Sequence, residues 1–268
     1  MSYHALSYWD VAAAAALILI NGIVSIALRL RMERSLLLAS IRTIVQLLLV
    51  GFVLQWVFAI DRWYVVIAML AVMTLVAGYT AGARNDRRFA GMWTSTLLSL
   101  GLSSWMITAY ALLVVLHGIE HWYQPQYAIP LMGMVLGNTL NGISVGLSTL
   151  TSELAQRRGE IDSALSLGAT RYEAALPTLR QAIRLGMTPI INSMMVVGLV
   201  SLPGMMTGQL LSGTSPIEAV KYQIMIMFLI ASATALGTVG VVALSYLHLF
   251  TRDHQFLFHA LEKRKQSL

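Results

Sequence analysis

Cysteine is absent from this chain of 268 residues, and charged residues make up only 11% of it. Without cysteine the chain cannot form a disulfide framework, a thiolate metal site or an iron–sulfur cluster. Soluble domains carry about 25% charged residues, whereas 57% of this chain is hydrophobic. The composition excludes a soluble globular domain and predicts an all-α polytopic membrane protein that is surrounded by membrane lipid.

A phosphate-binding loop is also missing, because no glycine in the chain is followed by lysine. The Walker A motif needs that lysine to reach the phosphates of a nucleotide. We therefore expect no cofactor on this chain and no enzymatic activity of its own. If transport is driven by ATP, the ATP and its Mg²⁺ must bind a partner subunit.

Long runs without charged residues predict the membrane spans. Each holds about 20 or more residues, which is the length of helix needed to cross a hydrocarbon core of about 30 Å. The first run has no charged segment before it, so we interpret it as a span and not as a cleaved signal peptide. The seven runs cover residues 11–28, 43–60, 63–83, 89–119, 121–152, 185–217 and 222–251.

Lysine and arginine fix the predicted orientation. Of the 18 such residues, only Arg62 and Lys221 fall on the side of the membrane where the chain begins. Basic residues concentrate on the cytoplasmic side of membrane proteins. The chain is therefore predicted to begin outside and end inside. The net charge of +6 does not indicate nucleic-acid binding, because the basic residues lie at the ends of apolar runs.

One hydrophilic segment, residues 153–184, interrupts the apolar runs and is predicted to be cytosolic. Its sequence predicts a helix over residues 162–167 that Gly168 closes with a left-handed backbone. Thr170, with Glu173 three residues later, forms a capping box for a second helix. We expect the first helix to contact a cytosolic partner through its apolar side chains. Alternatively, these side chains pack against the protein's own spans. The candidates for coupling are Asp162, Ala164, Leu165, Leu167, Gly168, Thr170 and Glu173.

Polar and helix-breaking residues inside the apolar runs are candidates for a substrate pathway. Such residues usually face a cavity or a protein partner, because lipid penalises them. Pro203-Gly204 is expected to break the sixth run. The alternative is tight packing, to which the pairs Gly133/Gly137 and Gly142/Gly146 point. The candidates are Arg42, Gln46, Asn138, Asn141, Asn192, Pro203, Met205, Met206 and Gln209.

His117, Glu120 and His121 match the H-x-x-E-H pattern of inverted zinc proteases. On a helix the two histidines would share a face. However, the three residues lie where the fourth run leaves the membrane, Gly118 between them favours a turn, and no third ligand is near. A metalloprotease is therefore the third choice of function. No aspartate or glutamate lies in the middle of a run, which also disfavours a secondary transporter.

The segment DSALSLGAT, residues 162–170, resembles the cytoplasmic E-A-A-x-x-x-G loop of ATP-binding-cassette (ABC) permeases. Asp162 replaces the glutamate, Ser163 and Ala164 replace the two alanines, and Gly168 is the glycine. The segment VGLVSLPGMMTGQLLSGTSPIEAVKYQI, residues 197–224, is more specific. Together with Arg42 and Gln46, it resembles FetB-type permeases, which are bacterial iron-export subunits with plant relatives. The resemblance covers nearly the whole chain.

This resemblance implies a single permease domain over residues 1–268, with residues 153–184 as its coupling segment. It implies a homodimer that binds two copies of a FetA-type ATP-binding subunit in the inner (plasma) membrane and exports iron, which eases oxidative stress. We further expect the route to run between the two copies, lined by spans two, five and six. A secondary transporter or channel for a metal or small solute is the alternative.

Overall fold

The computed structural model describes residues 7–263, apart from residues 31, 86, 119–120 and 252. Its long helices are α1 (Tyr8–Ala27), α2 (Glu33–Ile60), α3 (Trp63–Ala83), α4 (Met92–Tyr110), α5 (Pro125–Gln156), α7 (Arg171–Val196) and α9 (Pro216–Leu249). The shorter elements are the π-helical turn η1 (Ala111–Val115), α6 (Arg158–Ser166), α8 (Gly204–Leu211), η2 (Phe258–Ala260) and the paired strands β1 (Arg87–Arg88) and β2 (Glu262–Lys263).

Six helices among the described residues are long and apolar enough to cross a membrane, with mean hydropathies from 1.3 to 2.2. They are α1, α2, α3, α4 with η1, α5 and α9, which confirms the all-α polytopic class. The sixth predicted span, residues 185–217, is divided, as its predicted break implies, and is not one of these six helices. Its apolar residues are divided between the end of α7 and the separate helix α8, and the part of α7 before them carries Arg180 and Arg184.

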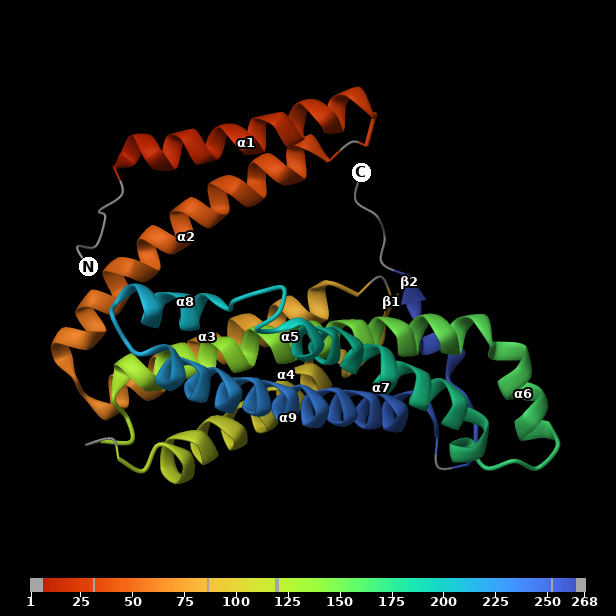
Figure 1. The fold of residues 1–268 in the computed structure, drawn as a ribbon. Helices are drawn as coiled ribbons and strands as arrows, with labels where there is room; N and C mark the ends of the chain where they lie inside the picture. The colour runs from red at the N-terminus through yellow and green to blue at the C-terminus, as the bar shows by residue number, and fades with distance from the viewer. Residues whose placement is uncertain (1–6, 31, 86, 119–120, 252, 264–268) are drawn as a thin grey trace.

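Helices α5, α7 and α9 lie side by side and form the centre of the bundle, with α3 and α4 packed against them (Figure 1). Helix α6 lies at one end of these helices and α8 at the other. The first helix begins at the end where α8 lies, and the last helix ends near α6 (Figure 1). The start of α1 and the end of α9 thus lie at opposite ends of the bundle, as the predicted orientation requires.

Glycines bring the three central helices into close contact. A Cβ atom on Gly186 of α7 would lie 2.5 Å from Cγ2 of Thr238 and 2.8 Å from the carbonyl oxygen of Gly142. A Cβ on Gly146 would lie 3.0 Å from the same Thr238 methyl. The predicted packing role of Gly142 and Gly146 is therefore confirmed. Gly137, in contrast, has open space where a Cβ would lie.

Helices α1 and α2 form a hairpin that stands apart from the bundle (Figure 1). In the most apolar window of each helix only 6% of the residues are buried. Near its C-terminal end α2 meets the bundle, where Val57 is buried. A wide apolar surface on the hairpin is thus left without contacts from this chain.

Candidate functional site

The break in the sixth predicted span forms one wall of the candidate site. Helix α7 ends at Val196, and Gly198 adopts a φ of +83°, which an L-residue rarely tolerates. The Gly198 N–H donates to the carbonyl oxygen of Ser201 at 2.9 Å, which turns the chain back. Pro203 is the N-cap of α8. The predicted break at Pro203-Gly204 is confirmed, and it begins several residues earlier, at Val197.

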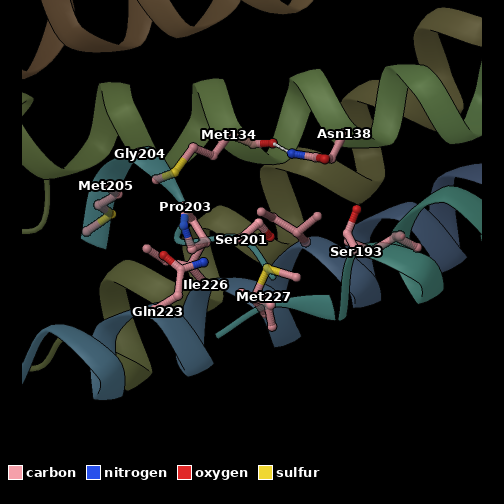
Figure 2. Close-up of a pocket in the computed structure, with 13 residues that line it drawn as sticks. Met134, Asn138, Ser193, Ser201, Pro203, Gly204, Met205, Gln223, Ile226 and Met227 are labelled. Atoms are coloured by element: carbon pink, nitrogen blue, oxygen red, sulfur yellow. Dashed lines mark hydrogen bonds between the residues drawn. The ribbon is translucent and has the colours of Figure 1, made fainter. Parts of the chain in front are cut away.

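A cavity of about 480 Å³ lies beside this break, between α5, α7, α8 and α9. Figure 2 shows side chains of α5 on one side and of α9 on the other, with the broken segment between them. Irregular backbone at membrane depth is tolerated where it lines a cavity or is buried in protein. The lining residues are Met134, Asn138, Ile190, Ser193, Val197, Ser201, Pro203, Gly204, Met205, Gln223, Ile226, Met227 and Ile230.

The polar groups of the cavity are amides and hydroxyls. The Asn138 Nδ2 donates to the Met134 carbonyl oxygen at 2.8 Å, and the Ser193 hydroxyl donates to the Pro189 carbonyl oxygen at 3.0 Å. Gln223 is only 7% exposed, and its side-chain amide makes no hydrogen bond to another described residue. Buried polar groups nearly always have a partner. The Gln223 amide is therefore free to bind a molecule in the cavity.

Three thioethers also line the cavity, those of Met134 on α5, Met205 on α8 and Met227 on α9. Within the described residues, no acidic, basic or histidine side chain contributes to the lining. The cavity is thus uncharged, with a few hydrogen-bonding groups set among sulfur and aliphatic carbon.

The structure brings together three of the predicted pathway residues, Asn138, Pro203 and Met205. Asn141 lies one turn further along α5, where its Oδ1 accepts from the Arg84 guanidinium at 2.9 Å. The others lie outside the cavity lining. Asn192 is exposed on α7, Met206 and Gln209 are on α8, and Arg42 and Gln46 are exposed on α2.

Sequence reasoning missed Gln223 and Ser193. Gln223 is the second residue of the last apolar run and Ser193 follows Asn192, so both carried the signal that selected the other candidates, a polar side chain in an apolar run. Gln209, which was selected, has a buried Oε1 without a hydrogen-bond partner among the described residues.

His117 and His121 do not lie on one helix, in agreement with the turn that Gly118 predicts. The helix containing η1 ends at Val115, and residues 116–118 form a turn. His121 stacks on Tyr123 with ring centroids 5.2 Å apart, and Glu120 lies outside the described residues. Within the part of the chain that the structure describes, no group of three His, Asp or Glu residues could hold a metal ion.

The coupling segment folds as two helices joined by a tight turn. Helix α6 begins four residues before the predicted start at Asp162 and ends at Ser166, and Gly168 has the predicted left-handed backbone, with φ +93°. The capping box is confirmed. The Thr170 N–H donates to Glu173 Oε2 at 2.8 Å, and the Glu173 N–H donates to the Thr170 hydroxyl at 3.3 Å. The bond from the Thr170 backbone, then that from its hydroxyl, lowers the pKa of Glu173.

The side chains of α6 divide into a packed and an exposed set. Ile161 is 3% exposed, and Ala164 and Leu165 are half-buried, with Leu165 packed against the core. Leu167 is 89% exposed. Asp162 is exposed and pairs with Arg158 at 3.3 Å. Part of this helix therefore packs against the protein itself, whereas the Leu167 side chain remains exposed.

The chain after α9 returns to this segment and holds it. The Arg171 N–H donates to His254 Nδ1 at 3.0 Å, and the Arg171 guanidinium donates to the Thr251 carbonyl oxygen at 2.9 Å. The guanidinium of Arg158 lies 4.3 Å from the ring centroid of Phe258. Beyond it, β2 pairs with β1 in the connection between α3 and α4. The turn between α6 and α7 is thus held by contacts with the segment that follows α9.

Comparison with known proteins identifies the family to which this chain belongs. Residues 8–250 match the uncharacterised protein family UPF0014. The chain belongs to this family. It is 43% identical over 228 residues to the UPF0014 membrane protein slr1647 of Synechocystis, covering 85% of this chain and 88% of the relative. It is 30% identical over 264 residues to the probable iron export permease protein FetB of Escherichia coli, covering 98% and 100%.

A plant protein is also similar. The chain is 33% identical over 248 residues to the protein ALUMINUM SENSITIVE 3 of Arabidopsis thaliana, covering 92% of this chain and 89% of the relative. No solved structure matches the chain. With its six apolar helices, membership in this family makes the chain a multi-pass membrane protein, consistent with the inner membrane.

Proposed function

We propose that this chain is the permease subunit of an ABC exporter, that its cargo is iron, and that a separate FetA-type ATP-binding subunit drives it. Such export would contribute to iron homeostasis and to resistance to oxidative stress. The observation that carries the proposal is helix α6, a short helix fixed at one end of the bundle with Leu167 89% exposed. An exposed apolar side chain on such a helix fits the groove of a partner. The printed name of FetB supports iron as the cargo.

The assembly we propose is a homodimer with the route between its two copies. Asn138 and Asn141 are exposed on α5, and Arg42 and Gln46 are exposed on α2. These polar groups lie within spanning helices, where lipid contact is unfavourable. A second copy facing them, with water along the route, would supply the polar environment that they need.

Reconstitution tests this proposal. The chain is placed in liposomes with its ATP-binding subunit, and the movement of radioactive iron is followed with and without ATP. We expect movement only with ATP, and no ATP hydrolysis by the isolated chain, because it has no phosphate-binding loop. Iron movement that needs no ATP would favour the channel or secondary transporter. Specific ATP hydrolysis by the isolated chain would contradict the division into two subunits.

A further inference from the structure

The chemical form of the cargo is constrained by the charge of the cavity. Carboxylates and other oxygens are the ligands that hard divalent cations take from proteins, and an ion moved from water into a low-dielectric site without an opposite charge is strongly destabilised. The cavity of about 480 Å³ is lined by amides, hydroxyls, thioethers and aliphatic groups. The residues that line it therefore offer no negative charge to balance that of a bare Fe²⁺ ion.

The fixed charges beside the cavity are also unfavourable for a cation. Arg84 donates to Asn141, one turn along α5 from the cavity residue Asn138. Arg184 lies on α7, two turns before the cavity residue Ile190. The acidic residues among those described lie in the end turns of the spanning helices or in the segments that connect them. Lys221 and Glu218 at the start of α9 pair with each other at 2.7 Å, so the charges near the cavity are net positive and would repel a free cation and attract an anion.

The size and lining of the cavity suit a small organic molecule. Sites for such molecules have volumes of about 300–1,000 Å³, with mostly apolar walls and a few polar groups that fix orientation. Among the described residues, the Gln223 amide is a buried polar group without a hydrogen-bond partner, 7% exposed, and it lies in the cavity wall (Figure 2). An amide can both donate to and accept from a ligand's oxygen-bearing groups.

We propose that the cavity takes iron as an organic chelate of zero or negative net charge, that it excludes the free divalent ion, and that Gln223 hydrogen-bonds the oxygen groups of the chelate. The thioethers and isoleucines then contact the carbon skeleton of the ligand. This proposal rests on the proposed function, since it specifies the form in which that cargo is bound.

Equilibrium dialysis of the purified chain in lipid nanodiscs tests the proposal, with radioactive ferric citrate and with Fe²⁺ kept reduced by ascorbate as the two probes. We expect saturable binding of ferric citrate only. Gln223→Leu should weaken this binding by about three- to tenfold, the effect of one lost hydrogen bond. It should not unfold the protein, because it removes a buried polar group that has no protein partner. Gln181→Leu, which changes an exposed glutamine of α7 outside the cavity, should bind like the unchanged protein.

A second variant distinguishes the effect of charge at position 223 on citrate binding from the effect of the lost hydrogen bond. Gln223→Glu keeps the size of the side chain and adds a negative charge, so it should weaken citrate binding more than Gln223→Leu does. Saturable binding of Fe²⁺ to the unchanged protein, no binding of ferric citrate, or equal binding by all three Gln223 forms would each overturn the proposal.

The transport assay distinguishes this failure from failure of the proposed function. ATP-dependent movement of iron supplied as Fe²⁺, in preference to the chelate, would overturn the chelate proposal and leave the iron exporter standing. If neither form moved while the assembled complex hydrolysed ATP, iron itself would be the wrong cargo. Movement of the chelate alone, reduced by Gln223→Leu, would support both.

Discussion

The capping box of Thr170 and Glu173, which the sequence predicts, lowers the pKa of the Glu173 carboxyl group. Both hydrogen bonds of the capping box are present, and the bonds from Thr170 lower the pKa of Glu173 from its ordinary value of 4.5. A carboxylate whose pKa is lower in the folded protein stabilises the fold above its unfolded pKa, and this contribution is lost as the pH falls through the folded pKa. The start of α7 should therefore weaken in acid.

We predict that Glu173→Gln lowers the melting temperature at pH 7 by at most a few °C. The difference from the unchanged protein should shrink as the pH falls from 4.5 through the lowered pKa of Glu173 in the folded protein, because the folded protein then also binds a proton at this carboxylate. Thermal unfolding in detergent, followed by tryptophan fluorescence at several pH values, measures the effect. A difference that stays constant down to pH 3 would show that the charge of Glu173 has no part in it.

Gly142 and Gly137 lie on the same helix but have different surroundings. A Cβ on Gly142 would lie 2.5 Å from Cγ2 of Thr234 and 3.0 Å from the Gly186 carbonyl oxygen, whereas one on Gly137 would meet nothing within 4 Å. We predict that Gly142→Ala destabilises the protein by about 1–3 kcal/mol, the usual effect of overpacking. Gly137→Ala is the matched control and should leave the melting temperature unchanged or raise it. Equal effects of the two substitutions would contradict the close packing of α5, α7 and α9.

At the scale of elements, α6 provides the test of coupling. Ile161 is buried against the protein itself, and Leu167 is exposed. We predict that Leu167→Asp reaches the membrane at normal levels but loses co-purification of the ATP-binding subunit and iron export together. The reason is that a charge at a docked apolar contact is strongly unfavourable.

Ile161→Asp is the comparison for this experiment, and it should lower the amount of folded protein. If Leu167→Asp behaved like Ile161→Asp, Leu167 would have a structural role. If it assembled and exported iron normally, this end of α6 would have no part in coupling.

Local patterns predicted most of the elements because their causes are local. The capping box, the left-handed Gly168 and the break at Pro203 depend on residues a few positions apart, and each is present. Residues 185–217 were predicted as one span broken at Pro203, but the helix already ends at Val196, because length and lack of charge cannot show where a helix inside an apolar run ends. The turn at Gly118 was predicted correctly because it too has a local cause, and the helix before it stops at Val115.

The cavity could be predicted only in part. Asn138, Pro203 and Met205 were identified because polar and helix-breaking residues are unusual in an apolar run. Gln223 carried the same signal, but whether it faces the cavity depends on how α9 is rotated against α5, and that rotation is set by contacts between distant residues. The placement of Arg42 outside the cavity likewise follows from the separation of the α1–α2 hairpin from the bundle.

At the scale of the whole molecule, the proposed route between two copies predicts which exposed surfaces meet water. Asn138 and Asn141 are exposed on α5, and Leu102 is 71% exposed on α4. In a monomer surrounded by lipid, Leu102 and the exposed parts of both asparagines would face hydrocarbon. In the proposed dimer, the two asparagines face the route and Leu102 still faces lipid.

Because the chain has no cysteine, single introduced cysteines can be compared directly. We predict that Asn138→Cys and Asn141→Cys react with a membrane-impermeant thiol reagent in intact membranes, at least about tenfold faster than Leu102→Cys, because thiols react as thiolates and a thiol in apolar surroundings stays protonated. ATP with the ATP-binding subunit present should change the rate at Asn138, which lines the cavity beside the broken span, more than the rate at Leu102. If the asparagine positions reacted as slowly as Leu102 in every nucleotide state, they would face lipid, and the route would have to lie elsewhere.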